Sequence, residues 1–396
     1  MWKAAAGALI ASLASGIPAC TGEDPPFSPG INASDGGLDG SSLDGAPLND
    51  AGVATCDADL TSDPAHCGAC GHACAGCAAG LCPVTTLRTG LSNPYALLLD
   101  GQDLFFSTVS FPGALSNKHA VHQYSLGANS EGPLVATKRS FVAGLAVTSS
   151  ELFWTDLTNN GEVARCTRSG CSSPEPFATI GSTPYGIVVV GSNVYWANRD
   201  GQLIQSCPLS GSCTPTTTAN VDPKYPTELA TDGSSLFWTA FDLSLDEGGA
   251  VYRCSLPNCS DVTAFATNQK SPSGIAVFGG NVYWANSGTK LNQRADGSIW
   301  TATTAGTDAR ELIRTTNALR IAVDATGFYW TSGGSEGSIL RCPLAGCAGK
   351  PLALAIGQRR PAGLALGQSH VFWLNGGTLL DGGSGLDDGT LMSVVK

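Results

Sequence analysis

Residues 273–286 read SGIAVFGGNVYWAN, and this stretch decides the fold. It holds a short β-branched run, a glycine turn and a second run that contains the aromatic doublet Tyr283-Trp284. Short runs of β-branched and aromatic residues, bounded by glycine, serine or asparagine, are typical of β-strands. The stretch therefore predicts two strands that are joined by a tight turn.

The aromatic doublet recurs along the chain. Its seven copies are Phe105-Phe106, Phe153-Trp154, Tyr195-Trp196, Phe237-Trp238, Tyr283-Trp284, Tyr329-Trp330 and Phe372-Trp373. The steps between second members are 48, 42, 42, 46, 46 and 43 residues. A period of about 40–50 residues is typical of a propeller blade, and each period holds four short strand-like runs. We therefore predict an all-β fold, with a seven-bladed β-propeller over residues 83–396.

The two ends of the repeat region are complementary. The last unit stops after its third run, residues 389–394, and the chain before the first unit supplies an unassigned run over residues 84–89. We predict that this run pairs beside residues 390–394 and completes the last blade. Such pairing removes an open sheet edge, which otherwise invites aggregation.

The repeat resembles the YWTD-type propeller repeat of lipoprotein-receptor ectodomains and, more loosely, the NHL and antibiotic-lyase propellers. Phe153-Trp154-Thr155-Asp156 is the copy that comes near the full tetrad. The resemblance covers residues 83–396 at the level of repeat shape, and it implies the propeller fold.

The N-terminus carries the features of an export signal over residues 1–19. Lys3 precedes an apolar run, Ala4 to Leu13, that is too short to span a bilayer permanently. Ile17-Pro18-Ala19-Cys20 follows and resembles a bacterial lipobox. The resemblance implies cleavage before Cys20, lipidation of its thiol and, because Thr21 follows, an anchor in the cell outer membrane. Ordinary secretion, with Cys20 incidental, is the alternative.

Residues 20–55 are predicted to be a disordered, lipid-anchored linker. Positions 21–55 hold six acidic residues and no lysine or arginine, and such a segment cannot bury enough apolar surface to offset ordering. The formal net charge of the chain is −11, but residues 83–396 hold 20 basic and 23 acidic side chains. A nearly neutral propeller lacks the basic stripe of nucleic-acid-binding proteins, so no nucleic-acid partner is expected.

Residues 56–82 form a cysteine-rich module with Cys56, Cys67, Cys70, Cys74, Cys77 and Cys82. Residues 63–74, DPAHCGACGHAC, resemble the module of the plant stigma-specific protein family, copies of which are frequent in surface proteins of myxobacteria. A segment this short needs staples in an exported chain, so three disulfides are expected, with fifteen pairings open. Zinc binding, with His66 and His72 near the thiols, and a Cys67–Cys70 redox pair are the alternatives.

The other eight cysteines form four close pairs: Cys166/Cys171, Cys207/Cys213, Cys254/Cys259 and Cys342/Cys347. Each pair occupies the same place in its repeat, after the third run and before the fourth. A hairpin corner brings two Cα atoms within the roughly 4.4–6.8 Å that a disulfide requires. We therefore predict four disulfides within blades. The chain has 15 cysteines, so only Cys20 is left without a local group.

Few patterns suggest catalysis. Gly333-Gly334-Ser335-Glu336-Gly337 matches G-x-S-x-G but lies between two strand-like runs, which predicts a hairpin loop rather than a nucleophile elbow. His119 and His122 are interpreted as structural. Asp381, Asp387 and Asp388 lie in a glycine-rich loop, for which cation binding is the alternative to a solvated loop. The doublet tryptophans are expected to pack between sheets with their N–H groups bonded locally, the alternative being an aromatic ligand platform. Trp300 lies on a third run and breaks no pattern of packing.

These observations favour a binding protein. No paired carboxylates, Ser/His/Asp set or histidine-rich ligand set recurs near one face, so we expect no catalytic residues, no metal and no cofactor. We predict a surface-anchored lipoprotein that contacts the membrane through its lipid and presents the propeller to a protein or glycan. The alternative is a propeller enzyme of the lyase or lactonase type, with a metal in the central channel; converging Asp, Asn, Glu or His side chains there would favour it.

Overall fold

The computed structural model describes residues 59–396 except 70–71, 110–119, 133, 138–140, 158–160, 171–173, 212, 222–223 and 380–385. The predicted signal peptide, the linker and Cys20 lie outside the described residues. Residues Leu60–Lys396 form one compact unit. Within the described part of the chain, no helix has the length and apolar character needed to cross a membrane.

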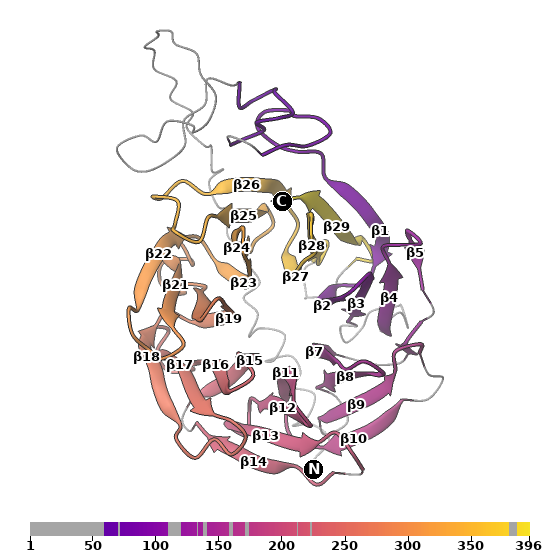
Figure 1. Ribbon diagram of the computed structural model, residues 1–396, viewed down its shortest axis with the longest axis vertical. Helices are drawn as coiled ribbons and strands as arrows, with labels where there is room; N and C mark the ends of the chain where they lie inside the picture. Colours follow the sequence, from indigo (N-terminus) through magenta and orange to yellow (C-terminus); the bar gives the residue numbers. More distant parts are fainter. Residues whose placement is uncertain are drawn as a thin grey trace. The chain divides into compact units, whose positions relative to one another are not determined.

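Seven antiparallel sheets surround a central axis (Figure 1). The innermost strands are β2 (Pro94–Asp100), β7 (Val142–Val147), β11 (Pro184–Val190), β15 (Tyr225–Thr231), β19 (Pro272–Phe278), β23 (Ala318–Asp324) and β27 (Pro361–Leu366). The second strands are β3 (Asp103–Thr108), β8 (Glu151–Asp156), β12 (Asn193–Asn198), β16 (Ser235–Phe241), β20 (Asn281–Asn286), β24 (Gly327–Ser332) and β28 (His370–Asn375).

The outer half of each blade completes the sheet. The third strands are β4 (Ala120–Ser125), β9 (Glu162–Thr167), β13 (Leu203–Pro208), β17 (Gly249–Ser255), β21 (Gly297–Thr303), β25 (Gly337–Cys342) and β29 (Gly389–Val395). The outermost strands are β5 (Ser130–Glu131) with β6 (Ala136–Thr137), then β10 (Glu175–Thr179), β14 (Thr216–Asn220), β18 (Thr263–Gln269), β22 (Arg310–Thr315), β26 (Leu352–Gln358) and β1 (Thr85–Leu91). The predicted seven-bladed propeller is confirmed.

The ring closes through β1, which lies far from its partner in sequence. β1 pairs antiparallel with β29, so that Thr85 is opposite Ser393 and Leu91 is opposite Gly389. The last blade therefore takes three strands from the C-terminus and its outermost strand from the start of the repeat region (Figure 1). The predicted closure is confirmed.

The aromatic doublet is explained by the alternation of side chains along a strand. Adjacent residues point to opposite faces of a sheet, so the first member faces one neighbouring blade and the second member faces the other. Trp196 shares a buried cluster with Phe153 of the preceding blade, and Phe106 shares one with Phe372 across the closure. Every second member of a doublet is 0% exposed. The doublets are therefore interblade packing residues and offer no ligand platform.

The indole N–H groups are bonded differently from the prediction of local partners. Trp284 donates to Gln269 Oε1 at 2.7 Å and Trp373 donates to Gln358 Oε1 at 3.0 Å. Both glutamines end the outermost strand of the preceding blade. Among the described residues, the N–H of Trp196 has no hydrogen-bond partner. The prediction was wrong because the acceptors come from another blade, or are missing.

The cysteine-rich module packs directly on the propeller. Cys67 and Cys82 are 0% and 3% exposed and share a buried cluster with Leu354 of β26 and Val394 of β29. A Cβ added at Gly68 would lie 2.8 Å from a methyl carbon of Leu352. The module thus continues the apolar interface between the sixth and seventh blades outward.

Removal of the closing strand tests the architecture. A chain that begins at residue 92 lacks β1 and exposes the edge of β29, and it loses the burial of Leu87 and Leu91, which is worth about 3 kcal/mol or more. We expect a lower guanidinium midpoint and aggregation, measured by fluorescence and light scattering. A chain that begins at Val84 also lacks the cysteine-rich module but keeps β1, so it is the matched control and should have the higher midpoint and aggregate less. Equal midpoints for both truncations would contradict the closure.

The hydrogen bonds of Gln358 join the sixth blade to the seventh, and substitution of Gln358 tests their importance. Gln358 accepts from Trp373 Nε1 and from Asn375 Nδ2, the latter at 2.9 Å. Gln358→Ala therefore leaves the buried indole N–H unpaired, while Asn375 Nδ2 keeps Thr390 Oγ1 at 3.2 Å. An unpaired buried donor costs about 1–3 kcal/mol, and we expect a loss of about 2 kcal/mol in the free energy of unfolding. Gln102→Ala, at an exposed turn, should change it by less than about 0.5 kcal/mol. A loss as small as that for Gln358→Ala would show that the hydrogen bonds of Gln358 do not stabilise the contact between these blades.

Candidate functional site

The centre of the propeller is lined by one repeat position that the sequence analysis did not single out. It stands ten residues before the second member of each doublet. Its occupants are Ala96, Gly144, Gly186, Glu228, Gly274, Arg320 and Gly363. Five of the seven are small, so the two charged residues break a pattern. Alignment of the innermost strands on the doublet would have found them.

Small residues at this position let neighbouring innermost strands touch. A Cβ added at Gly186 would lie 2.6 Å from Thr227 O, and one added at Gly274 would lie 2.7 Å from Leu319 O. Real Cβ atoms do not approach a carbonyl oxygen so closely, so glycine is required by the close approach of the backbone. The backbones of neighbouring innermost strands therefore contact each other directly around the hub.

Hydroxyl groups on the second strands join the innermost strands of successive blades. Thr155 Oγ1 accepts the N–H of Gly144 at 2.9 Å and donates to Tyr185 O of the next blade at 2.6 Å. Ser107 does the same for Ala96 and Val142. Each innermost strand has a register shift at this point, as between Val142 and Gly144. The hydroxyl satisfies the backbone groups that this bulge leaves unpaired.

Glu228 and Arg320 form an ion pair at the hub. Arg320 Nη1 donates to Glu228 Oε1, and the pair joins the fourth blade to the sixth. The guanidinium carbon also lies 5.0 Å from the ring centroid of Tyr95. Burial lowers the pKa of Arg320, but the Glu228 carboxylate and Tyr95 outweigh this and hold that pKa above its ordinary value. Arg320 therefore keeps its charge, with the Glu228 carboxyl group as its partner.

The space that remains at the hub is small. A cavity of about 150 Å³ is lined by parts of all the innermost strands, including Tyr95, Glu228 and Arg320. Pockets that enclose a typical small ligand have about 300–1,000 Å³. The described residues at the hub supply one carboxylate, and that carboxylate is engaged by a guanidinium.

A stack of planar side chains lies beside the hub. Arg199 is 7% exposed, and its guanidinium carbon lies 5.2 Å from the ring of Tyr185 and 5.0 Å from that of Phe241. Tyr225 stacks on Phe241 at 5.4 Å. Burial, with a smaller contribution from Tyr95, raises the pKa of Tyr185 to about 12. Tyr185 therefore stays a neutral hydroxyl that accepts from Arg199 at 3.1 Å.

In the part of the chain that the structure describes, three blades share one type of ion pair on the face that holds the loops between second and third strands, here called the loop face. The cation stands 14 residues before the second doublet residue. The pairs are Lys224–Asp242 at 2.5 Å, Lys270–Asp296 at 3.0 Å and Arg359–Asp388 at 3.5 Å. Each carboxylate also accepts backbone N–H groups in its own loop. The blade-to-blade connections are thus tied to the loops.

The contacts of Asp388 bear on the cation-binding alternative for the loop at residues 381–388. Asp388 accepts from Thr378 N at 2.8 Å and from Thr378 Oγ1 at 2.7 Å, so it acts as a loop anchor. Asp381 lies outside the described residues.

The structural interpretation of His119 and His122 can be checked at His122. His122 receives or gives a hydrogen bond with Thr108 at 3.0 Å and stacks on Phe106, while His119 lies outside the described residues. Burial lowers the pKa of His122, which favours the neutral ring.

The remaining sequence candidates are structural. Gly333 to Glu336 connect β24 to β25, which confirms the predicted hairpin loop. Trp300 lies on β21, where its ring is 6.1 Å from that of Trp284 and its N–H donates to Ser298 Oγ at 3.0 Å. Neither feature brings a nucleophile near a base.

The disulfides staple the outer hairpins. Cys207–Cys213, Cys254–Cys259 and Cys342–Cys347 are bonded. Cys166 is also disulfide-bonded, and Cys171, its predicted partner, lies outside the described residues. The first cysteine of each pair lies within the third strand rather than after it, as Cys207 does in β13. The third-to-fourth hairpin is therefore closed at its base.

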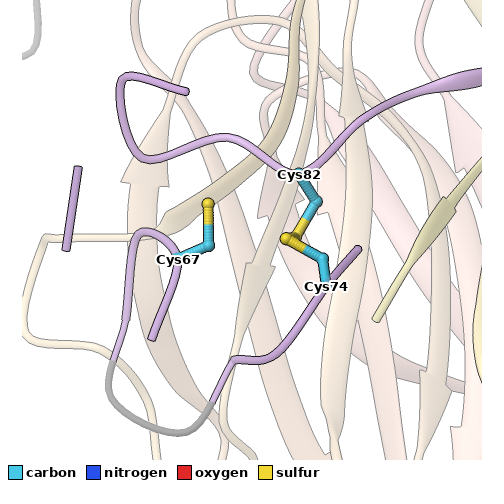
Figure 2. A group of neighbouring side chains, drawn as sticks. All are labelled: Cys67, Cys74 and Cys82. Atoms are coloured by element: carbon cyan, nitrogen blue, oxygen red, sulfur yellow. A yellow bond between two sulfur atoms is a disulfide. The ribbon is translucent and has the colours of Figure 1, made fainter. Parts of the chain in front are cut away.

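The cysteine-rich module contains the bonds Cys67–Cys77 and Cys74–Cys82. Cys56 and Cys70 lie outside the described residues, so the third predicted bond does too. The sulfur atoms of Cys67, Cys74 and Cys82 all lie within 4.8 Å of one another (Figure 2). Because these sulfurs are already bonded in pairs, they are not thiolates, and thiolates are what zinc requires.

Comparison with known proteins identifies the fold. No protein-family model and no curated protein matches the sequence. The chain is similar to the solved structure of U3-55K, with a TM-score of 0.61 and 11% identity over 79% of this chain and 98% of that chain. It is also similar to the computationally designed protein Ika8, with a TM-score of 0.50 and 13% identity over 76% and 83%.

A chain of the nidogen/laminin complex is similar with a TM-score of 0.49 and 15% identity over 64% of this chain and 92% of that chain. At these identities the likeness concerns the fold and does not extend to function.

The hub ion pair can be tested by a double-mutant cycle. Removal of one partner from a buried pair costs about 3–5 kcal/mol, but the side chains of Arg320 and Glu228 remain 18% and 25% exposed. We therefore expect Glu228→Ala to lower the free energy of unfolding by about 2 kcal/mol. The double variant Glu228→Ala/Arg320→Ala, which copies the small residue of the other blades, should recover most of this loss.

Glu311→Ala is the matched control, because it breaks the exposed pair with Arg314 and should cost less than about 0.5 kcal/mol. Chemical denaturation followed by tryptophan fluorescence measures these three variants and the single variant Arg320→Ala, which completes the cycle. Additive losses for Glu228 and Arg320 would show that the two side chains do not depend on each other.

Proposed function

We propose that the protein is a surface-anchored, non-catalytic binding protein that presents its propeller to a protein or glycan. The small hub cavity carries this proposal. A space of about 150 Å³, occupied at one side by a neutralised Glu228–Arg320 pair, is too small to enclose a glycan or peptide. A large partner must therefore bind to an outer face of the propeller.

The loop face is suited to this role because its loops are preorganised. The pKa of Asp242 is held below its usual range, chiefly by the hydrogen bond from Lys224. This stabilisation is present above about pH 4, the pKa of an unfolded Asp, and is lost as the pH falls further. Loops that are already ordered lose little entropy on binding, which favours affinity.

The anchoring part of the proposal rests on the sequence. The export signal over residues 1–19 and the lipobox-like Ile17-Pro18-Ala19-Cys20 support a lipid on Cys20, and several acyl chains together hold a protein stably on a membrane. The acidic linker over residues 20–55 then gives the propeller reach from the outer membrane.

Cys20→Ala separates anchoring from binding. Wild-type protein extracted from membranes should lack residues 1–19 and carry added acyl mass, measured on the intact protein after reduction. The variant should leave the membrane fraction almost completely, because its lipid attachment site is gone. Since the propeller is unchanged, the soluble variant should bind the same glycan or protein on an array with a Kd within about twofold of the wild type.

Recovery of the variant in the membrane at the wild-type level would refute the anchor. Turnover of a small substrate by the variant, with no saturable complex on the array, would refute the binding role. Leu60→Ser, at an exposed site within the cysteine-rich module, is the control for expression and export.

A further inference from the structure

Three leucines on the loop face are strongly exposed. Leu243, Leu245 and Leu291 are 61%, 64% and 90% exposed. Leu243 and Leu245 lie between β16 and β17, and Leu291 lies between β20 and β21. Single exposed leucines need no explanation, but an apolar set on adjoining loops indicates an interaction surface. Residues 242–248 and 287–296 are called the leucine loops below.

Each leucine loop is held rigid by a carboxylate at its base. Asp242 Oδ1 accepts from Ser244 N at 2.8 Å and from Leu245 N at 3.2 Å. Asp296 accepts from Thr289 N at 2.7 Å and from Asn292 Nδ2 at 2.9 Å. The leucines are thus displayed on ordered turns, and ordering them for a partner costs little entropy.

The two leucine loops are also joined to each other. Lys290 N donates to Asp246 Oδ2 at 2.8 Å. Leu245 precedes Asp246 and Leu291 follows Lys290 in the chain, so both leucines adjoin the bonded pair. The fourth and fifth blades therefore present their leucines from a single connected platform.

An acidic hollow adjoins this platform. A pocket of about 300 Å³ is lined by Leu245, Asp246, Glu247, Gly248 and Asn268. The Glu247 side chain is 65% exposed and shares Lys270 with Asp296, at 3.4 and 3.0 Å. The four carboxylates of Asp242, Asp246, Glu247 and Asp296 exceed the three lysines of this region, Lys224, Lys270 and Lys290, by one charge. A hollow with two carboxylates and an apolar wall matches the charged head and aliphatic stem of a Lys or Arg side chain.

We propose that the leucine loops are the docking site for an extended protein segment that places a Lys or Arg side chain in the hollow beside Asp246 and Glu247 and covers Leu243, Leu245 and Leu291 with flanking apolar side chains. This inference rests on the proposed binding function and names its partner class. The charge of the hollow selects the basic residue, and the leucines supply the area that is removed from water.

The test selects ligands from a phage-displayed library of random twelve-residue peptides, panned against the full Cys20→Ala chain. Enriched peptides should carry a Lys or Arg flanked by apolar residues, and a synthetic copy should bind with an affinity that falls as salt rises. Leu243→Ser/Leu245→Ser/Leu291→Ser should weaken it at least tenfold in fluorescence polarisation. Glu247→Gln, which leaves the fold intact, should weaken it about threefold or more.

Leu134→Ser/Ile356→Ser is the matched control, because these side chains are 46% and 53% exposed away from the leucine loops, and its affinity should equal the wild type. Replacement of the peptide's basic residue by norleucine repeats the test of the hollow without any change to the protein.

Enriched peptides without a basic residue, or peptides whose binding survives the triple variant, would overturn the docking site while leaving the binding function in place. Self-association or binding to phosphatidylcholine vesicles that the triple variant abolishes, with no basic peptide enriched, would overturn it in favour of a second copy or a lipid surface. Absence of binding to any peptide, protein or glycan by the wild type would remove the proposed function as well.

Discussion

The whole structure depends on the fact that two adjacent residues of a β-strand face opposite sides of the sheet. A doublet of large aromatic side chains on the second strand of a blade therefore fills two interfaces at once. Every second member of a doublet is fully buried. Each blade therefore packs one aromatic side chain against the preceding blade and the other against the following blade. A blade with only one aromatic would leave one interface short of volume, so the doublet must recur in every blade for the ring to close.

Closure imposes the opposite requirement at the axis. Seven innermost strands converge there, and their backbones approach too closely for side chains at the position occupied by Gly186 and Gly274. The interfaces between blades need large side chains, whereas the hub needs small ones. The hub position lies ten residues before the second member of the doublet in each repeat. Glu228 and Arg320 depart from this rule together, and they are compatible with the hub because each neutralises the other. A single charged residue there would leave a half-buried charge unpaired.

The regular features could be predicted from the sequence because they follow from strand alternation and repetition. The blade count, the closing strand and the hairpin cysteines each occupy a fixed place in the period. The acceptors of the tryptophan N–H groups could not be assigned in this way, because Gln269 and Gln358 belong to a different blade from the indoles they bind. The packing of the cysteine-rich module was also hidden, since its irregular chain has no period that indicates which surface it contacts.

The same reasoning indicates where function lies in a repeat fold. Positions that obey the repeat are already committed to closure: the doublets are buried, the glycines hold strands together and the paired loop carboxylates hold turns. Specific recognition must come from residues that the repeat does not require. Leu245 and Leu291 satisfy this condition, because their loops are anchored by Asp242 and Asp296 while their side chains contribute nothing to the core. The fold supplies a rigid base, and the exposed leucines are free to be selected for a partner.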